Sequence, residues 1–377
     1  MVTEEQVRRS LRNVLDPEIG RPIEDLGMLQ SIEVDGDLVR VQVLLTIAGC
    51  PLEERIAGDV KAALAPLGVE RVDVRTTPMD DRQRAELVEK LRGSAGAQQK
   101  TFFADTDISV IAVASGKGGV GKSTVTINLS CALAAEGHKV GVLDADVWGF
   151  SVPRMMGVSG QPVGFNNMIL PLQVHDVKVM SIGFFVPEGE PVIWRGPMLH
   201  KAIEQFLGDV YWGDLDFLFV DLPPGTGDVA ISLTSFLPGA SMLVVTTPQQ
   251  AAHKVAERAG KMAERTSLRP IGVIENMSWF VCPHCGEKTT IFGEGGGEET
   301  AQTLGVPLLG QIPLVPAIRE GGDEGRPIVV ADPDSPAGAA LRDAAVKIAQ
   351  ATRTTVGKPL PIGTTPGTAA GDGPQVQ

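Results

Sequence analysis

The chain has 377 residues, a formal net charge of −13, 43% hydrophobic residues and 21% charged residues. This length suffices for one large domain and a smaller one, and the composition is typical of a globular protein. The acidic balance and the lack of a basic cluster argue against nucleic acid as a ligand, and no apolar run approaches the roughly 18 residues of a membrane span. The polar N-terminus is unlike a signal peptide, so we expect a cytoplasmic protein with no membrane partner.

Residues 1–78 are expected to form a small α+β domain. Apolar residues recur there at helical and strand periods, and an Asp-Gly pair at 35–36 predicts a hairpin. A charged helix is expected to open the linker at 79–107, whose second half is rich in Gly, Ser and Ala. The predicted elements are helices at 4–15, 52–65 and 80–91, and strands at 29–34, 38–47 and 69–76.

Two stretches of this first segment, DPEIGRPIEDLGML and LLTIAGCPLEERI, resemble the small domain that recurs in iron–sulfur assembly factors. Cys50 lies in a Gly-Cys-Pro turn before a predicted helix, whose dipole would lower the pKa of a thiol. A packed structural cysteine explains the residue equally well, because no second ligand is near it in the sequence. The role of Cys50 therefore stays open.

Residues 108–353 alternate between strands and helices, which predicts an α/β fold with a doubly wound, mostly parallel sheet. Ligands bind at the carboxyl ends of the strands in such sheets. The tail at 354–377 is rich in Pro, Gly and Thr and is expected to be disordered. The predicted strands are 108–115, 139–145, 177–183, 216–222, 240–247, 269–275 and 307–312, and a closing helix is expected at 341–352.

A glycine-rich loop follows the first of these strands and leads into a helix. Its sequence, GKGGVGKS, fits the phosphate-binding pattern G-x-x-x-x-G-K-[ST], in which backbone N–H groups and Lys122 contact phosphates and the Ser123 hydroxyl suits Mg²⁺. The same residues contain G-x-G-x-x-G, but a dinucleotide site needs neither the lysine nor the hydroxyl, and Asp144 lies too far along. The residues expected to bind ATP are Gly116, Lys117, Gly118, Gly119, Val120, Gly121, Lys122, Ser123 and Thr124.

The second lysine of the loop, Lys117, is not required by an ordinary P-loop. The string GKGGVGKST resembles the deviant Walker A family that includes MinD, the ParA partition ATPases and the nitrogenase iron protein. That resemblance implies that Lys117 reaches the nucleotide of a partner subunit in a homodimer. A solvated loop lysine is the alternative.

Carboxylates end two of the predicted strands. Asp144 and Asp146 follow one strand, and the resemblance implies that Asp144 lies near Mg²⁺ while Asp146 orients the attacking water; Asp146 could instead cap a turn. Asp221 follows Phe-Leu-Phe-Val, as in a Walker B strand, and is expected to hold Mg²⁺. Asn276 follows a later strand and either reads adenine, as in relatives, or is a turn residue.

Cys282 and Cys285 form the only C-x-x-C pair of a chain with four cysteines. Cys131 lies on an apolar helix face and is expected in the core. One pair gives two ligands, whereas tetrahedral zinc or a cubane cluster needs four, so two subunits would each supply a pair. Zinc, a redox disulfide and a bridging [4Fe–4S] cluster all remain compatible with the spacing.

The motifs GKGGVGKST, DADVWG, DLPPGTGD, ENMSWFVCPHCG and FGEGGGEETAQTLGVPLLGQIPL together resemble the Mrp-type (ApbC/Nbp) iron–sulfur cluster carrier ATPases over residues 108–350. The resemblance implies slow ATP hydrolysis with Mg²⁺, and a labile [4Fe–4S] cluster that Cys282 and Cys285 hold between two subunits. Cluster donors and apo client proteins would then be the partners. A ParA/MinD-like positioning ATPase and a zinc-bridged scaffold are the alternatives; the sequence lacks the basic C-terminal membrane helix typical of MinD.

Overall fold

The computed structural model describes residues 2–46, 52–69, 71–92, 103, 106–146, 149–165, 168–186, 196–225, 236–237, 239–249, 252–282 and 284–353. Cys50, residues 93–102, 104 and 105 of the linker, and the tail at 354–377 lie outside the described residues, as does the end of the DLPPGTGD motif after Gly225. In the described part of the chain, no helix is long and apolar enough to cross a bilayer.

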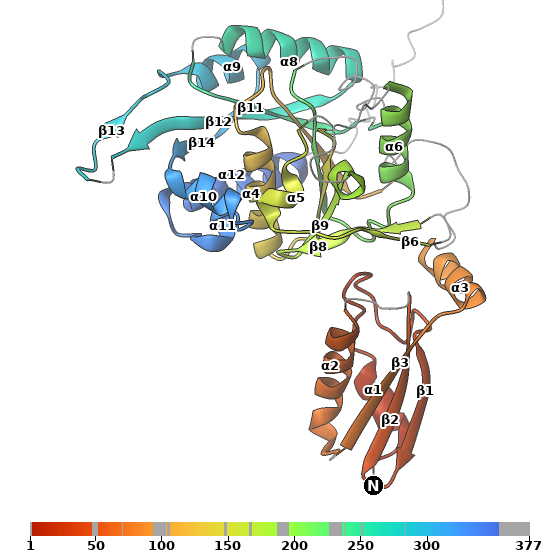
Figure 1. Ribbon diagram of the computed structural model, residues 1–377. Helices are drawn as coiled ribbons and strands as arrows, with labels where there is room; N and C mark the ends of the chain where they lie inside the picture. The colour runs from red at the N-terminus through yellow and green to blue at the C-terminus, as the bar shows by residue number, and fades with distance from the viewer. Residues whose placement is uncertain are drawn as a thin grey trace, which may run out of the picture.

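The first segment contains a three-stranded sheet with helices on it (Figure 1). The central strand pairs antiparallel with the first and parallel with the third. Helix α1 begins at a capping box, in which Thr3 and Gln6 satisfy each other's backbone N–H groups. The elements are α1 (Glu4–Leu11), β1 (Leu29–Asp35), β2 (Leu38–Leu45), α2 (Glu53–Leu64), a 3₁₀ turn (Ala65–Leu67), β3 (Arg71–Pro78) and α3 (Asp81–Arg92).

The second segment contains a nine-stranded sheet among the described residues, in the order β13-β12-β11-β4-β10-β5-β9-β8, with β14 paired to β12. All pairs are parallel except those of β13 and β8 at the edges. The strands are β4 (Ser109–Ala114), β5 (Val140–Asp144), β8 (Leu172–Val174), β9 (Val177–Ser181), β10 (Phe217–Asp221), β11 (Ser241–Thr246), β12 (Arg269–Val281), β13 (Lys288–Thr289) and β14 (Leu308–Leu314).

Helices cover both faces of this sheet, which confirms the predicted α/β fold (Figure 1). The central strands are continuous apolar runs because both of their faces are buried. The helices are α4 (Lys122–Ala135), α5 (Val152–Met156), a 3₁₀ turn (Ile182–Phe185), α6 (Gly196–Gly208), α8 (Ala252–Thr266), α9 (Gly296–Leu304), α10 (Pro316–Asp323), α11 (Ile328–Ala331) and α12 (Pro336–Arg353); a small hairpin is formed by β6 (Val163–Phe165) and β7 (Met168–Leu170).

The structure differs from the sequence expectation mainly in β12. The strand was expected to end at residue 275 but continues to Val281, because its second half pairs with β13 and with the end of β14. The short strands β6, β7, β8 and β13 were not predicted, since two or three residues carry no measurable periodicity.

Strand register brings the acidic strand ends together. Asp221 of β10 pairs with Asp144 of β5 on one side and with Val113 of β4 on the other. The glycine-rich loop leaves β4 at the same edge. The parallel topology therefore places two carboxylates beside the phosphate-binding loop.

Candidate functional site

The glycine-rich loop joins β4 to α4, and its last residue, Gly121, is the N-cap of the helix. Gly121 has φ of 79°, which favours glycine. A Cβ atom there would lie 2.2 Å from Nδ2 of Asn276. Arg258 of α8 donates a hydrogen bond of 3.0 Å to the Gly116 carbonyl at the other end of the loop. Neighbouring elements thus fix the loop at both ends.

Asp221 is the centre of a buried polar cluster at the start of α4. Its Oδ1 atom lies 2.6 Å from Nζ of Lys122 and accepts a hydrogen bond of 2.9 Å from Thr126. Its Oδ2 atom accepts one of 2.5 Å from Ser123. Lys122 is only 6% exposed and Asp221 is fully buried, so these donors compensate a charge that would otherwise be very costly.

Asp144 adds a second buried carboxylate beside the first. It accepts hydrogen bonds from the Ser181 hydroxyl at 3.0 Å and from the backbone N–H groups of Asp146 and Val152 at 3.2 and 3.3 Å. Burial and the nearby Asp221 raise the pKa of Asp144 to about 7, although Lys122 opposes this rise. Two buried carboxylates share one lysine here, and this oxygen-rich donor set fits a hard divalent cation such as Mg²⁺.

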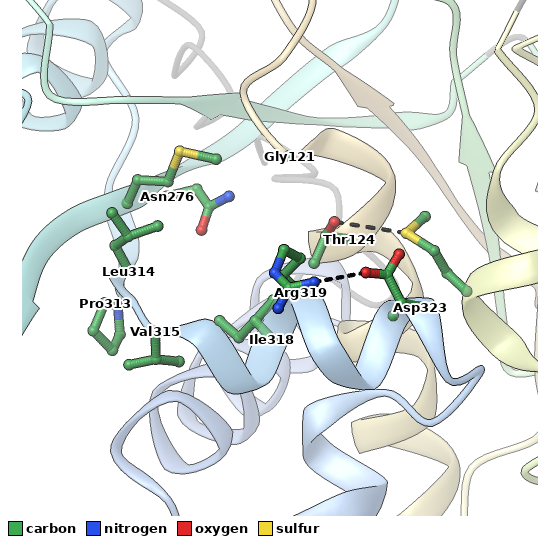
Figure 2. A pocket seen from close by; sticks show the side chains of 12 residues that line it. Gly121, Thr124, Asn276, Pro313, Leu314, Val315, Ile318, Arg319 and Asp323 are labelled. Atoms are coloured by element: carbon green, nitrogen blue, oxygen red, sulfur yellow. Dashed lines mark hydrogen bonds and ion pairs between the residues drawn. The ribbon is translucent and has the colours of Figure 1, made fainter. Parts of the chain in front are cut away.

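A cavity of about 230 Å³ lies over the loop, and residues 117–124 line it together with Asp146, Ser151 and Pro224. A second cavity of about 240 Å³ adjoins it and shares Gly121, Thr124 and Met155 with the first. Figure 2 shows the second cavity, whose walls come from β12, the end of β14 and α10. The cavity over the loop is rich in backbone N–H groups, which suits the phosphates of a nucleotide. The adjoining cavity is mostly apolar, which suits the base.

Asn276 lies in β12 and is buried against the loop, where its Nδ2 donates a hydrogen bond of 2.9 Å to the Val120 carbonyl. Its side chain lines the apolar cavity (Figure 2). The sequence predicted a nucleotide-binding role for Gly121, Thr124 and Asn276, but not for the lining residues that come from β14 and α10. The notable additions are Leu314 and Ile318, which only the fold brings opposite the loop.

Lys117 also lines the cavity over the loop. Its ammonium group donates a hydrogen bond to Oε1 of Gln249, three residues after β11 ends. Lys122 is therefore directed to the strand-end carboxylates, whereas Lys117 is directed to a neutral amide at the surface.

Cys282 and Cys285 lie in the turn between β12 and β13, at the end of a hairpin that extends away from the sheet (Figure 1). Backbone hydrogen bonds shape the turn: Cys282 N donates to Glu287 O at 3.0 Å, and Gly286 N donates to Cys282 O at 2.9 Å. Cys285 is exposed and Cys282 half-buried.

The turn favours the thiolate form of Cys282. Backbone N–H groups of Cys285 and His284 donate to its sulfur and, together with the Cys285 thiol, lower the pKa of Cys282. Among the described residues, no group of three or more His, Cys, Asp or Glu side chains could hold a metal ion. Cys131, by contrast, is buried in α4, and burial raises its pKa to about 12, as expected of a core cysteine.

Residues 108–349, which include the loop, the strand-end carboxylates and the cysteine pair, match the family described as NUBPL iron-transfer P-loop NTPase. The chain belongs to this family. Residues 4–75 match a second family, described as iron–sulfur cluster assembly protein. Both matches agree with the resemblances found in the sequence, and family membership makes the chain a P-loop NTPase.

Relatives share most of the length of this family member. An iron–sulfur cluster carrier protein of Mycobacterium leprae is 53% identical over 344 residues, covering 89% of this chain and 90% of its own. One of Synechocystis is 42% identical, with 93% and 98% covered. A solved nucleotide-binding protein of Archaeoglobus fulgidus, in complex with ADP, is 40% identical with a TM-score of 0.53, covering 58% of this chain and 88% of its own.

Proposed function

We propose that this protein is an ATP-hydrolysing carrier that holds a [4Fe–4S] cluster between two copies of the chain and passes it to apo client proteins. The observation that carries the proposal is the Cys282–Cys285 hairpin, which presents two thiols at the surface of a P-loop NTPase. Relatives up to 53% identical bear the name iron–sulfur cluster carrier protein. A pair with one exposed and one half-buried thiol at the surface suits a cargo that must leave again.

The two adjoining cavities would bind ATP. We assign the phosphates to residues 116–124 and the adenine to the apolar cavity beside Asn276. Lys122 would then exchange its contact with Asp221 for phosphate oxygens, and Ser123, Asp144 and Asp221 would hold Mg²⁺. The cation supplies positive charge against the phosphates, and Asp146, which lines the loop cavity, would orient the attacking water.

The cluster requires a second chain. Cys282 and Cys285 give two thiolates, and a [4Fe–4S] cluster takes four. A symmetric homodimer that brings two hairpins together supplies the other pair, and isologous pairing of this kind is the commonest in homo-oligomers. The lowered pKa of Cys282 favours the thiolate that iron binds.

Anaerobic reconstitution with ferrous iron and sulfide tests the cluster assignment. We expect the broad visible absorbance of an iron–sulfur cluster and one cluster per two chains. Cys282→Ser and Cys285→Ser should each lose the absorbance while still binding ADP. His284→Ala, which alters the same turn but removes no thiol, should keep it. Normal cluster loading of either cysteine variant would refute the proposal. Purified protein whose cysteine pair is saturated with zinc that never exchanges for iron would indicate a zinc-bridged scaffold.

Lys122→Ala tests the nucleotide assignment. The variant removes the buried cation that faces the phosphates, so ADP affinity measured by calorimetry should fall by at least about a hundredfold, and ATP hydrolysis should be lost. Lys261→Ala is the matched control, since Lys261 is exposed on α8 and forms an ion pair with Glu257 of the same helix. Circular dichroism should show that both variants fold. Hydrolysis at the wild-type rate by Lys122→Ala would contradict the assignment.

A further inference from the structure

Strand β12 runs from the apolar cavity to the cysteine hairpin, and it is irregular between them. Asn276 pairs with Ile312 of β14 and Phe280 pairs with Leu314, so a step of four residues on β12 matches a step of two on β14. Met277 begins this bulge with φ of 59°. Such a backbone conformation is strained for a non-glycine residue and persists only where the surroundings impose it.

The start of the bulge contacts the phosphate-binding loop. The Met277 side chain lines the apolar cavity, and its Cε atom lies 3.7 Å from the position that a Cβ on Gly121 would take. The preceding residue, Asn276, donates its hydrogen bond to the Val120 carbonyl. Ser278 closes the bulge with a hydrogen bond of 2.9 Å to the Glu275 carbonyl. The strained backbone is therefore held from the side on which the nucleotide would lie.

The end of the bulge contacts the same cavity from β14. Leu314, the partner of Phe280, lines the cavity together with Pro313 and Val315 (Figure 2). Cys282 follows Phe280 by two residues and begins the turn to β13. A ligand that fills the cavity touches Met277 of β12 and Leu314 of β14. These two residues lie at the two ends of the bulge, and the hairpin with the cysteines follows it.

We propose that the bulge at 277–279 couples the cavity to the hairpin, and that Met277 is the positioning residue through which nucleotide sets the geometry of Cys282 and Cys285. The inference rests on the proposed function, because it needs a nucleotide in the cavity and cargo on the thiols. The bulge has two arrangements that differ in their contacts with the ligand, and nucleotide shifts their populations by that difference in affinity. Cluster affinity then depends on nucleotide, and by linkage nucleotide affinity depends on the cluster.

Thiol labelling of the metal-free, full-length chain measures this coupling without a cluster. The Cys50→Ser substitution removes one other thiol, and Cys131 is buried and therefore protected from the reagent. Labelling with a neutral aromatic disulfide then reports on Cys282 and Cys285. Saturating ADP with Mg²⁺ should change the labelling rate constant by at least about fivefold. The rate constant should not depend on protein concentration, because the coupling lies within one chain. A response that grows with protein concentration would reflect association of chains and would overturn the inference.

Two pocket variants separate coupling from binding. Met277→Gly adopts the same backbone without strain and removes the side chain that lines the cavity beside Gly121, so at saturating ADP its labelling rate should no longer respond to nucleotide. Ile318→Ala removes an apolar wall of the same cavity from α10 without touching the bulge; it should weaken ADP binding yet keep the full response at saturation. A full response in Met277→Gly, or wild-type protein that binds ADP without any response, would overturn the coupling alone. Failure of wild-type protein to bind ADP would overturn the proposed function as well.

Discussion

At the scale of residues, a buried charge needs a partner supplied by the fold. Asp221 has Lys122, Ser123 and Thr126 around it, all from one helix that starts at the glycine loop. The sequence motif predicts the lysine and the serine because they bind phosphate and metal. The contact of Thr126 with the carboxylate comes from the helical repeat, since residues 122 and 126 lie four apart and share a face.

Within the described ranges no cation or hydrogen-bond donor is shown on the Glu18 carboxylate, and its ionisation should destabilise the fold. Burial and the neighbouring carboxylate of Asp16 raise the pKa of Glu18 to about 7, whereas in the unfolded chain it lies near its ordinary value of about 4.3. Between these values the folded chain binds more protons than the unfolded chain, so stability falls as pH rises from about 4.5 to 7 and then levels. Glu18→Gln removes this loss.

Thermal unfolding of wild-type protein and Glu18→Gln from pH 4.5 to 8 checks this expectation. The melting temperature of the variant relative to wild type should rise with pH up to about 7 and stay constant above it. Glu54→Gln, an exposed glutamate on α2, should show no such trend. A difference between Glu18→Gln and wild type that does not change with pH would contradict an elevated pKa.

At the residue scale, the sequence predicted positions correctly where a motif and the sheet topology together leave few possible locations for a side chain. The loop, Asp144 and Asp221 were expected together because strand ends of a parallel sheet meet at one edge, and the register places them there. The hydrogen bond between Asn276 and Val120 joins residues 156 positions apart, and no local pattern encodes such a contact. The same holds for Leu314 and Ile318 in the apolar cavity. The functional roles of all these residues stay predictions.

At the scale of elements, α9 is anchored by a carboxylate from β12. Glu275 is almost fully buried; its Oε2 accepts a hydrogen bond of 2.5 Å from the N–H of Gly297 in the first turn of α9, and its Oε1 accepts one of 2.9 Å from Gln311 of β14. The helix dipole favours a negative charge at this end. The glycine-rich turn at 293–297 therefore already holds an internal anion.

Glu275→Ala should accordingly destabilise the protein by on the order of 2 kcal/mol, because it leaves the buried N–H of Gly297 without its acceptor. Glu275→Gln keeps one acceptor oxygen and should cost less. Glu298→Ala removes an exposed acidic residue from the same helix turn and should cost less than about 1 kcal/mol. Chemical denaturation followed by circular dichroism ranks the three variants. If Glu275→Ala and Glu298→Ala lowered the free energy of unfolding equally, the buried hydrogen bonds of Glu275 would contribute no more to stability than an exposed acidic residue does.

The element boundaries also show the limits of sequence reading. The central strands β4, β5, β10 and β11 were predicted within one or two residues, because buried parallel strands are unbroken apolar runs. The end of β12 was missed because ENMSWFVC mixes polar and apolar residues without a period. Its extended shape comes from pairing with β13 and β14. Tertiary pairing therefore determines the conformation of this segment, which leads directly into the turn with the two cysteines.

At the scale of the whole molecule, one chain contains a nucleotide site and a pair of thiols, and each is completed only by a second chain under the proposed function. Lys117 tests this arrangement. In the isolated chain its ammonium group bonds to Gln249. A phosphate offers a charged acceptor and a stronger hydrogen bond than an amide oxygen, so ATP on a partner would draw Lys117 away from Gln249.

Lys117→Ala should therefore bind nucleotide within a few-fold of wild type but stay monomeric with a non-hydrolysable ATP analogue, and its ATP hydrolysis should fall on the order of a hundredfold. Gln249→Ala frees Lys117 without removing its charge, so it should dimerise at least as well as wild type. Sedimentation velocity with the analogue, with ADP and without nucleotide distinguishes the two variants. ATP-dependent dimers of Lys117→Ala with wild-type affinity would show that this lysine acts within its own chain, and the second chain would then have to be explained by the cysteine hairpins alone.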